Sequence, residues 1–357
     1  MNLDKMLRKE NNNLNLLRVL LAIIVIYYHS FSIFDNNFDG EFFLKYTGMG
    51  IGSLSVKVFF FLSGMLVTKS YIKNPNPFEW LISRGLRIVP AYYVVILFTA
   101  LVIGPTITSL DLNSYLSSPE THSFITGNAT FETVFLLPGI PEGRVNGLNG
   151  SIWTIHFEVF FYLLFIITAV LFANRCRILF ITILSVSFIL PLIGQKDLIY
   201  ESHDMQSYYL LLPCFSFGCI VACFSTSISR PNLKLACLIL AAFMPVFKFF
   251  GWDMLFFYSM TIFTCIGCLL IFTTNVAISL NLKSDISYGV YLWGFTVQQL
   301  VFLYITKNFY YGFFISLLLS IVVGMISWEV IEKPSMGMKK KIQSRGRKPQ
   351  LGITIDP

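Results

Sequence analysis

Five ionisable residues stand within or beside long apolar runs of this chain: Arg18, His29, Arg84, Arg87 and Glu158. An ionisable group at membrane depth costs free energy, so each is a functional candidate. A neutral imidazole can take a proton from a hydroxyl, and a nearby carboxylate can orient the ring and stabilise its charged form. His29 and Glu158 therefore have the chemistry of a general-base site.

The spacing of these residues predicts which of them lie at similar depth. Arg18 and His29 are 11 residues apart, so they share one face of a helix at a separation of about 16 Å. Glu158 lies about 10 Å below the outer end of its run, and His29 about 8 Å below the outer end of its own. We expect Glu158 to face His29. The alternative is that Glu158 only bonds a neighbouring Tyr or Trp and keeps helices in register.

Arg84 and Arg87 are three residues apart in "WLISRGLRIVPAYY" and are neighbours on one helix face. Two forked guanidinium groups side by side suit a phosphate. The alternative interpretation is that they only anchor the cytoplasmic end of a transmembrane helix.

Three further residues are weaker candidates. Ser63 and Gly64 interrupt the large side chains of "FFFLSGMLVTKS", where glycine allows a backbone or ligand to approach closely, or simply allows helices to pack. Lys57 lies within the same expected span, 54–72, and a lysine there can extend its amine toward the membrane surface.

The elements that must position these residues are transmembrane helices. Of the 357 residues, 55% are hydrophobic and only 13% are charged, against roughly 25% in a soluble domain. A soluble fold is excluded, and runs of about 20 apolar residues predict an all-α, polytopic membrane bundle of about ten helices. The expected spans are 15–34, 54–72, 88–108, 151–173, 178–194, 207–225, 233–250, 254–275, 286–305 and 311–331.

The basic residues predict the orientation of the bundle. Twenty of the 26 Lys and Arg residues fall on one side if the N-terminus is inside. Only Lys45, Arg144, Lys196, Lys248 and Lys307 fall outside, and Lys57 lies within a span. Positively charged loops stay in the cytoplasm, so both termini are predicted to be cytoplasmic. The net charge of +7 then reflects topology and contact with lipid headgroups, and we expect no nucleic-acid partner.

The remaining sequence predicts one membrane domain, residues 1–335, followed by a basic cytoplasmic tail, residues 336–357. The polar stretch 109–150 is expected to be an outer loop, acting as a lid or acceptor-binding surface or as a plain connector. Seven cysteines lie almost entirely in apolar runs and are interpreted as small buried hydrophobes. The C-x-x-C at Cys265 and Cys268 has no second pair, so no metal is expected.

Six motifs in order resemble the membrane acyltransferase family known as acyltransferase 3. They cover residues 14 to 335, nearly the whole chain. The matching elements are Arg18 with Tyr28 and His29, Phe59 to Leu66, Arg84 to Tyr92, Ser151 to Tyr162, Ser287 to Trp293, and Glu332 to Pro334.

The resemblance implies an activity and a role for each candidate. Such enzymes move an acyl group, usually acetyl, from cytoplasmic acyl-CoA to a hydroxyl of a carbohydrate or related envelope molecule. His29 would be the catalytic base or acyl carrier, with Glu158 as a second catalytic position. Arg84 and Arg87 would form the R-x-x-R pair that binds the donor acetyl-CoA, and Arg18 would join them. No metal is implied, and the location would be the bacterial inner membrane, among its lipids.

This chain departs from the family pattern at two positions. Gly294 stands where many members have a histidine, and Val159 replaces a second acid. A mechanism that needs a second histidine near the ninth span is therefore in doubt.

The expected acceptor is a lipid-linked or nascent surface polysaccharide such as O-antigen. The alternatives are an acyltransferase acting on peptidoglycan, a lipid or a small molecule, or a transporter or flippase of a glycolipid. A transporter predicts broken helices in two corresponding repeats, and no internal repeat is visible in the sequence.

Overall fold

The computed structural model describes residues 1–140, 147–172, 181–182, 203–280, 282 and 284–338, and within these ranges the chain is helical with no strand. The all-α prediction is confirmed. The long helices are α2 (Leu14–Ser30), α4 (Ile51–Lys73), α5 (Pro77–Phe98), α9 (Ile155–Phe172), α12 (His203–Cys223), α13 (Arg230–Phe249), α14 (Asp253–Phe272), α16 (Ser287–Tyr304) and α17 (Phe309–Ser327). The short ones are α1 (Leu3–Met6), α3 (Phe42–Thr47), α6 (Gly104–Ile107), α7 (Leu112–Ser117), α8 (Pro119–Ala129) and α15 (Asn275–Ser279).

Seven helical segments of the described chain are long and apolar enough to cross a membrane. They are Leu14–Asp35, Ile51–Lys73, Pro77–Ile107, Gly150–Leu171, Arg230–Phe249, Asp253–Phe272 and Phe309–Met338, and each overlaps an expected span. The expected span 178–194 lies almost entirely outside the described residues, and 207–225 corresponds to α12, whose described apolar part, Leu210–Cys223, is shorter. The chain is therefore a multi-pass membrane protein, while the count of ten and the side of the termini stay predictions.

The ninth expected span, 286–305, forms α16, the most enclosed long helix of the described bundle. Fifteen of its 18 residues are buried, so it packs on all sides against protein instead of lipid. Polar side chains such as Gln298 are satisfied inside: its amide nitrogen donates to Ile26 O and Ser30 Oγ, both at 2.8 Å. These contacts join the C-terminal parts of α2 and α16, while Arg18 near the beginning of α2 pairs with Asp285 just before α16. The two helices therefore run parallel.

Helix α5 begins earlier than predicted. The expected span started at residue 88, but the Asn76 side chain caps the helix by accepting from Glu79 N at 3.1 Å, and Pro77 occupies the first turn. The helix then continues through a π turn, Thr99–Ile103, into α6. Arg84 and Arg87 consequently lie well inside the helix, and not at its end.

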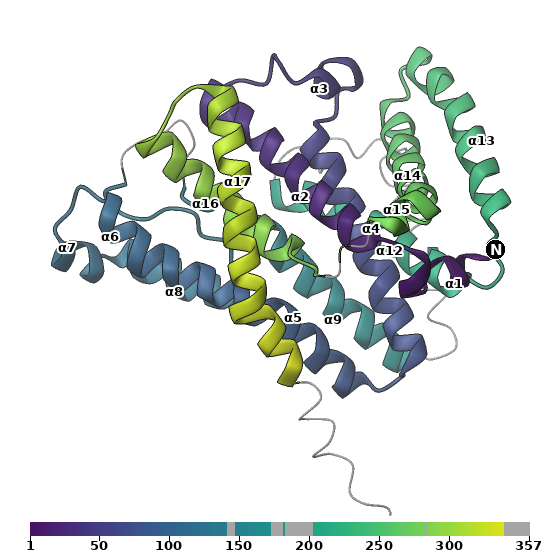
Figure 1. Ribbon diagram of the computed structural model, residues 1–357, viewed down its shortest axis with the longest axis horizontal. Coiled ribbons are helices and arrows are strands. Elements are labelled where there is room, and N and C mark those ends of the chain that lie inside the picture. Colours follow the sequence, from purple (N-terminus) through teal and green to yellow (C-terminus); the bar gives the residue numbers. More distant parts are fainter. Residues whose placement is uncertain (141–146, 173–180, 183–202, 281, 283, 339–357) are drawn as a thin grey trace, which may run out of the picture.

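The stretch 109–150 was expected to be a polar loop, and its described part contains two helices, α7 and α8. Helix α8 turns back along α5, where Tyr92 Oη donates to Asn128 O at 3.1 Å and Tyr93 Oη donates to Ala129 O at 2.8 Å. A turn of helix satisfies its own backbone groups, which a loop against the bundle would leave unpaired. Helices α7 and α8 thus form one edge of the molecule, with α13 and α14 at the opposite edge (Figure 1).

Glycines hold α4 and α12 in close contact. A Cβ on Gly64 would lie 2.1 Å from Phe215 O, and one on Gly218 would lie 2.1 Å from Phe61 O. The two helix backbones therefore touch where neither residue has a side chain, as small residues allow in membrane bundles. Gly64 faces α12, and Ser63, the residue before it, faces Glu158 and Tyr162 of α9.

Candidate functional site

Two adjoining cavities open among α2, α4, α5, α9 and α16. The larger, which we call the vestibule, has a volume of about 630 Å³ and includes Asn15, Ser83, Asp285 and Trp328 in its lining. The smaller, which we call the chamber, has a volume of about 100 Å³ and includes Ser63, Glu158, Tyr162 and Tyr291. Four residues line both cavities: Arg18, Leu66, Arg84 and Arg87. The three candidate arginines therefore stand where the vestibule meets the chamber.

The position of Arg18 is set by the first turn of α2. The Asn13 side chain caps this helix by accepting from Leu16 N at 3.2 Å, while its amide nitrogen donates to Ala277 O at 2.9 Å. Asn15 Nδ2 donates to Leu282 O at 3.0 Å. These bonds fix the beginning of α2 against the segment that precedes α16.

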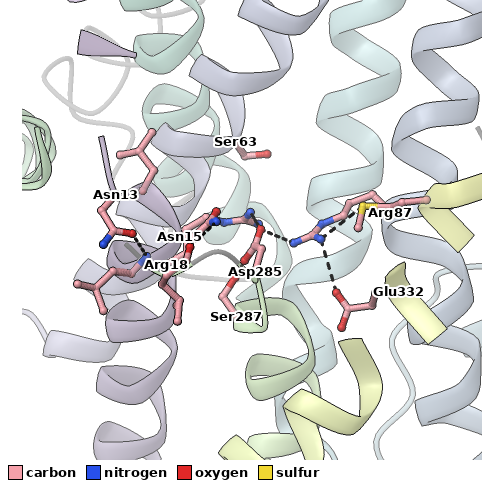
Figure 2. Close-up of polar contacts among 12 residues, drawn as sticks. Asn13, Asn15, Arg18, Ser63, Arg87, Asp285, Ser287 and Glu332 are labelled. Atoms are coloured by element: carbon pink, nitrogen blue, oxygen red, sulfur yellow. Dashed lines mark hydrogen bonds and ion pairs between the residues drawn. The ribbon is translucent and has the colours of Figure 1, made fainter. Parts of the chain in front are cut away.

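Asp285 joins two of the arginines. One oxygen, Oδ2, is ion-paired with Arg18 Nη1 and lies 2.6 Å from Arg87 Nη2, while Ser287 Oγ donates to Oδ1 at 2.5 Å (Figure 2). Burial acts to raise the pKa of Asp285, but the positive charges of Arg18 and Arg87 outweigh it and hold the pKa below its ordinary value. The carboxylate is therefore charged at neutral pH and neutralises part of the arginine cluster.

Glu332 completes this network from the far end of the chain. Its Oε2 lies 3.6 Å from Arg87 Nη1, and its Oε1 accepts from Ser327 Oγ at 3.1 Å. The Glu332 side chain is only 1% exposed. The Arg87 guanidinium also lies 5.7 Å from the centre of the Trp328 ring, within the range of a cation–π contact. Arg87 is thus enclosed by protein groups on several sides.

The polar centre of the chamber is formed by α9 and α4. Tyr162 Oη donates to Glu158 Oε1 at 2.6 Å, and Ser63 Oγ lies 2.8 Å from Tyr162 Oη and 3.3 Å from Glu158 Oε1. Glu158 and Tyr162 are one turn apart on α9, so they share a face. The carboxylate thus links α9 to α4 while lining the chamber.

His29 lies apart from this centre. Its ring is 5.1 Å from the ring of Phe295, in an edge-on arrangement, and it lines neither the vestibule nor the chamber. Tyr291, one turn before Phe295 on α16, does line the chamber and bonds Thr154 Oγ1 at 2.9 Å. His29 therefore stands about one helical turn beyond the end of the chamber, on the side away from the vestibule.

We expected Glu158 to face His29, but among the described residues these two side chains form no hydrogen bond. Glu158 bonds Tyr162 and Ser63 instead, because Tyr162 is on its own helix face and Ser63 is presented by the close contact of α4 with α12. Lys57 is 5% exposed, and its Nζ lies 3.3 Å from Sδ of Met49, which stands just before the beginning of α4.

Comparison with known proteins shows the family to which the chain belongs. A family profile described as an acyltransferase domain, Acyl_transf_3, matches residues 11–329. The chain belongs to the acyltransferase 3 family. It is therefore an acyltransferase, as the motif order predicted.

Two relatives of this acyltransferase illustrate the match. An O-acetyl transferase of Shigella phage Sf6 is 27% identical over 300 residues, covering 79% of this chain and 84% of the relative. Nodulation protein 10 of Rhizobium leguminosarum bv. viciae is 27% identical over 161 residues, covering 43% and 42%. No solved structure matches the chain.

The structure brings four of the five predicted site residues of the acyltransferase, Arg18, Arg84, Arg87 and Glu158, around one chamber, and leaves His29 beside it. Sequence reasoning gave no role to Asp285 or Glu332. Both residues were recognisable as candidates in the sequence. Asp285 is an acid directly before a mostly apolar helix, and Glu332 is the first residue of the E-K-P motif. Their partners are distant in the sequence, so only the fold shows what they bind.

Proposed function

We propose that this acyltransferase moves an acetyl group from cytoplasmic acetyl-CoA to a hydroxyl of a bacterial surface polysaccharide, such as O-antigen, from its place in the inner membrane. The observation that carries the proposal is the arginine-lined vestibule that leads into a small polar chamber. The similarity to an O-acetyl transferase over 84% of its length supports acetyl transfer to oxygen.

The vestibule suits the polar part of the donor. Guanidinium groups bind phosphate through paired, charge-assisted hydrogen bonds, and CoA has a diphosphate and a further phosphate. The pantetheine arm is an extended chain that would pass Leu66 and place the thioester in or beyond the chamber. A volume of about 100 Å³ favours a short acyl group over a long one.

His29 then lies between the donor and the side from which the acceptor arrives. As a base it takes the proton of the acceptor hydroxyl while that oxygen attacks the thioester carbonyl. The carbon–sulfur bond breaks as the tetrahedral intermediate collapses, and the imidazolium returns the proton to the leaving thiolate. In the alternative route, the imidazole nitrogen attacks the thioester first and then passes the acetyl group to the hydroxyl.

The activity is tested by expressing the chain in a bacterial host with a defined surface glycan. We expect new ester-linked acetyl groups on the glycan, measured by mass spectrometry of the purified polysaccharide before and after mild alkali. A host that carries the His29→Ala variant is the control. An unchanged glycan together with acetylation of another envelope molecule would contradict the proposed acceptor.

Replacing Glu158 by glutamine separates its structural and catalytic roles. The glutamine oxygen can still accept a hydrogen bond from Tyr162 Oη, so we expect a melting temperature close to that of the wild type. We expect the acetyl-transfer rate to fall by roughly tenfold or more, because the chamber loses its negative charge. Wild-type transfer by Glu158→Gln would mean that the carboxylate only keeps α9 in register with α4.

A further inference from the structure

The three arginines at the junction of vestibule and chamber differ in the side chains to which they are bonded. Arg18 is paired with Asp285, and Arg87 is paired with both Asp285 and Glu332. Arg84 forms no hydrogen bond or ion pair with any residue in the part of the chain that the structure describes, and its buried Nε lacks a partner. The R-x-x-R pair therefore consists of one occupied and one unoccupied guanidinium.

The unoccupied guanidinium is also the one that calls for a ligand. A buried donor of a charged group is costly to leave unpaired, so an acceptor from outside the described chain, either a water or a group of a ligand, must complete such a site. Arg84 lines both cavities, so its free donors face the path that a ligand would follow. Arg87 lines the same path, but its Nη1 and Nη2 already face carboxylates (Figure 2).

The proposed function already assigns the donor phosphate to the arginines of the vestibule. We propose that these arginines differ in role: Asp285 and Glu332 are positioning residues that hold Arg18 and Arg87 in a fixed ion network, which leaves Arg84 to bind the phosphate. This proposal rests on the proposed function for its donor. The network joins α2, α5, the segment before α16 and the π turn Trp328–Glu332, which are far apart in the sequence. It forms the rigid wall beside which Arg84 meets the ligand.

Loss of each arginine should then have a different consequence. Without Arg87, Glu332 would lose its only ion-pair partner in the described chain, although it is 1% exposed, and Asp285, 13% exposed, would lose one of two. A buried carboxyl group without a partner is destabilising, whether it stays charged or takes up a proton. Without Arg84, no described ion pair is broken. Loss of Arg87 should therefore lower the stability of the fold, and loss of Arg84 should weaken binding of the ligand.

The test uses the full-length protein in detergent, as wild type and as the variants Arg84→Gln, Arg87→Gln, Glu332→Gln and the double variant Arg87→Gln/Glu332→Gln. Calorimetry gives the dissociation constants of CoA and of pantetheine, which lacks the phosphates, and thermal unfolding gives the melting temperature. For Arg84→Gln we expect an unchanged melting temperature, CoA binding weakened by roughly 10- to 100-fold, and unchanged pantetheine binding. For Arg87→Gln we expect a lower melting temperature, which the added Glu332→Gln change partly restores.

Arg87→Lys keeps a positive charge beside both carboxylates, and it replaces Arg87→Gln if that variant does not fold. We expect it to fold with a reduced melting temperature and with CoA affinity near that of the wild type. The inference is overturned if Arg84→Gln binds CoA normally or melts as early as Arg87→Gln, or if Arg87→Lys keeps its melting temperature and loses CoA binding. If the wild type bound no CoA, the proposed donor and the role of Arg84 would fall, whereas the unfolding measurements would still test the network.

Discussion

Replacing His29 with alanine is expected to lower the rate of acetyl transfer by roughly 10²- to 10⁴-fold while leaving the affinity for CoA unchanged. The first effect follows from the loss of the base or acyl carrier. The second follows from the position of the ring, which contacts Phe295 and lines neither the vestibule nor the chamber. Initial rates with labelled acetyl-CoA in membranes, together with calorimetry of CoA binding, measure both effects.

The matched control is His122→Ala. His122 is an exposed histidine on α8, where its Nε2 lies 2.9 Å from Leu116 O. We expect it to transfer acetyl at the wild-type rate. Transfer by a folded His29→Ala variant at the wild-type rate would remove the catalytic assignment. Label retained on the wild-type protein without acceptor, and absent from the His29→Ala variant, would select the acyl-histidine route over direct transfer.

The sequence predicted four of the residues that line the candidate site, but it did not predict their pairings. An arginine or glutamate in an apolar run is recognisable as a functional candidate, because placing an ionisable group at membrane depth costs free energy. This criterion identified Arg18 and Glu158. The depth of a residue in its helix can also be counted from the helical rise. Neither the residue type nor its depth says which of the other helices lies opposite that residue in the bundle. Glu158 was therefore expected to meet His29, whereas in the fold it meets Ser63 of α4.

The fold was predicted to a similar extent. Apolar length located seven of the expected spans, because the membrane fixes that length. It misplaced the beginning of α5, where polar residues from Pro77 onward are helical because the Asn76 cap and neighbouring protein satisfy them. It also described 109–150 as a loop, since α8 owes its place to tyrosines of α5 that no local pattern reveals.

Replacing Gly64 with valine is expected to lower the free energy of unfolding by about 3 kcal/mol or more, and to abolish transfer with it. A Cβ at this position would lie 2.1 Å from Phe215 O, a backbone atom that cannot rotate away. Helices α4 and α12 would have to separate, and Ser63 would move with α4 away from Glu158. Thermal unfolding and size-exclusion profiles of the purified protein measure the loss.

Gly267→Val is the matched control, because the same substitution is made in the apolar helix α14 where a Cβ would meet nothing within 4 Å. It carries the same cost of a β-branched residue in a helix, so the difference between the two variants isolates the contact of α4 with α12. We expect Gly267→Val to stay within about 1 kcal/mol of the wild type. Equal melting temperatures for the two variants would show that α4 and α12 do not touch at Gly64, and the chamber would then lack the wall that presents Ser63.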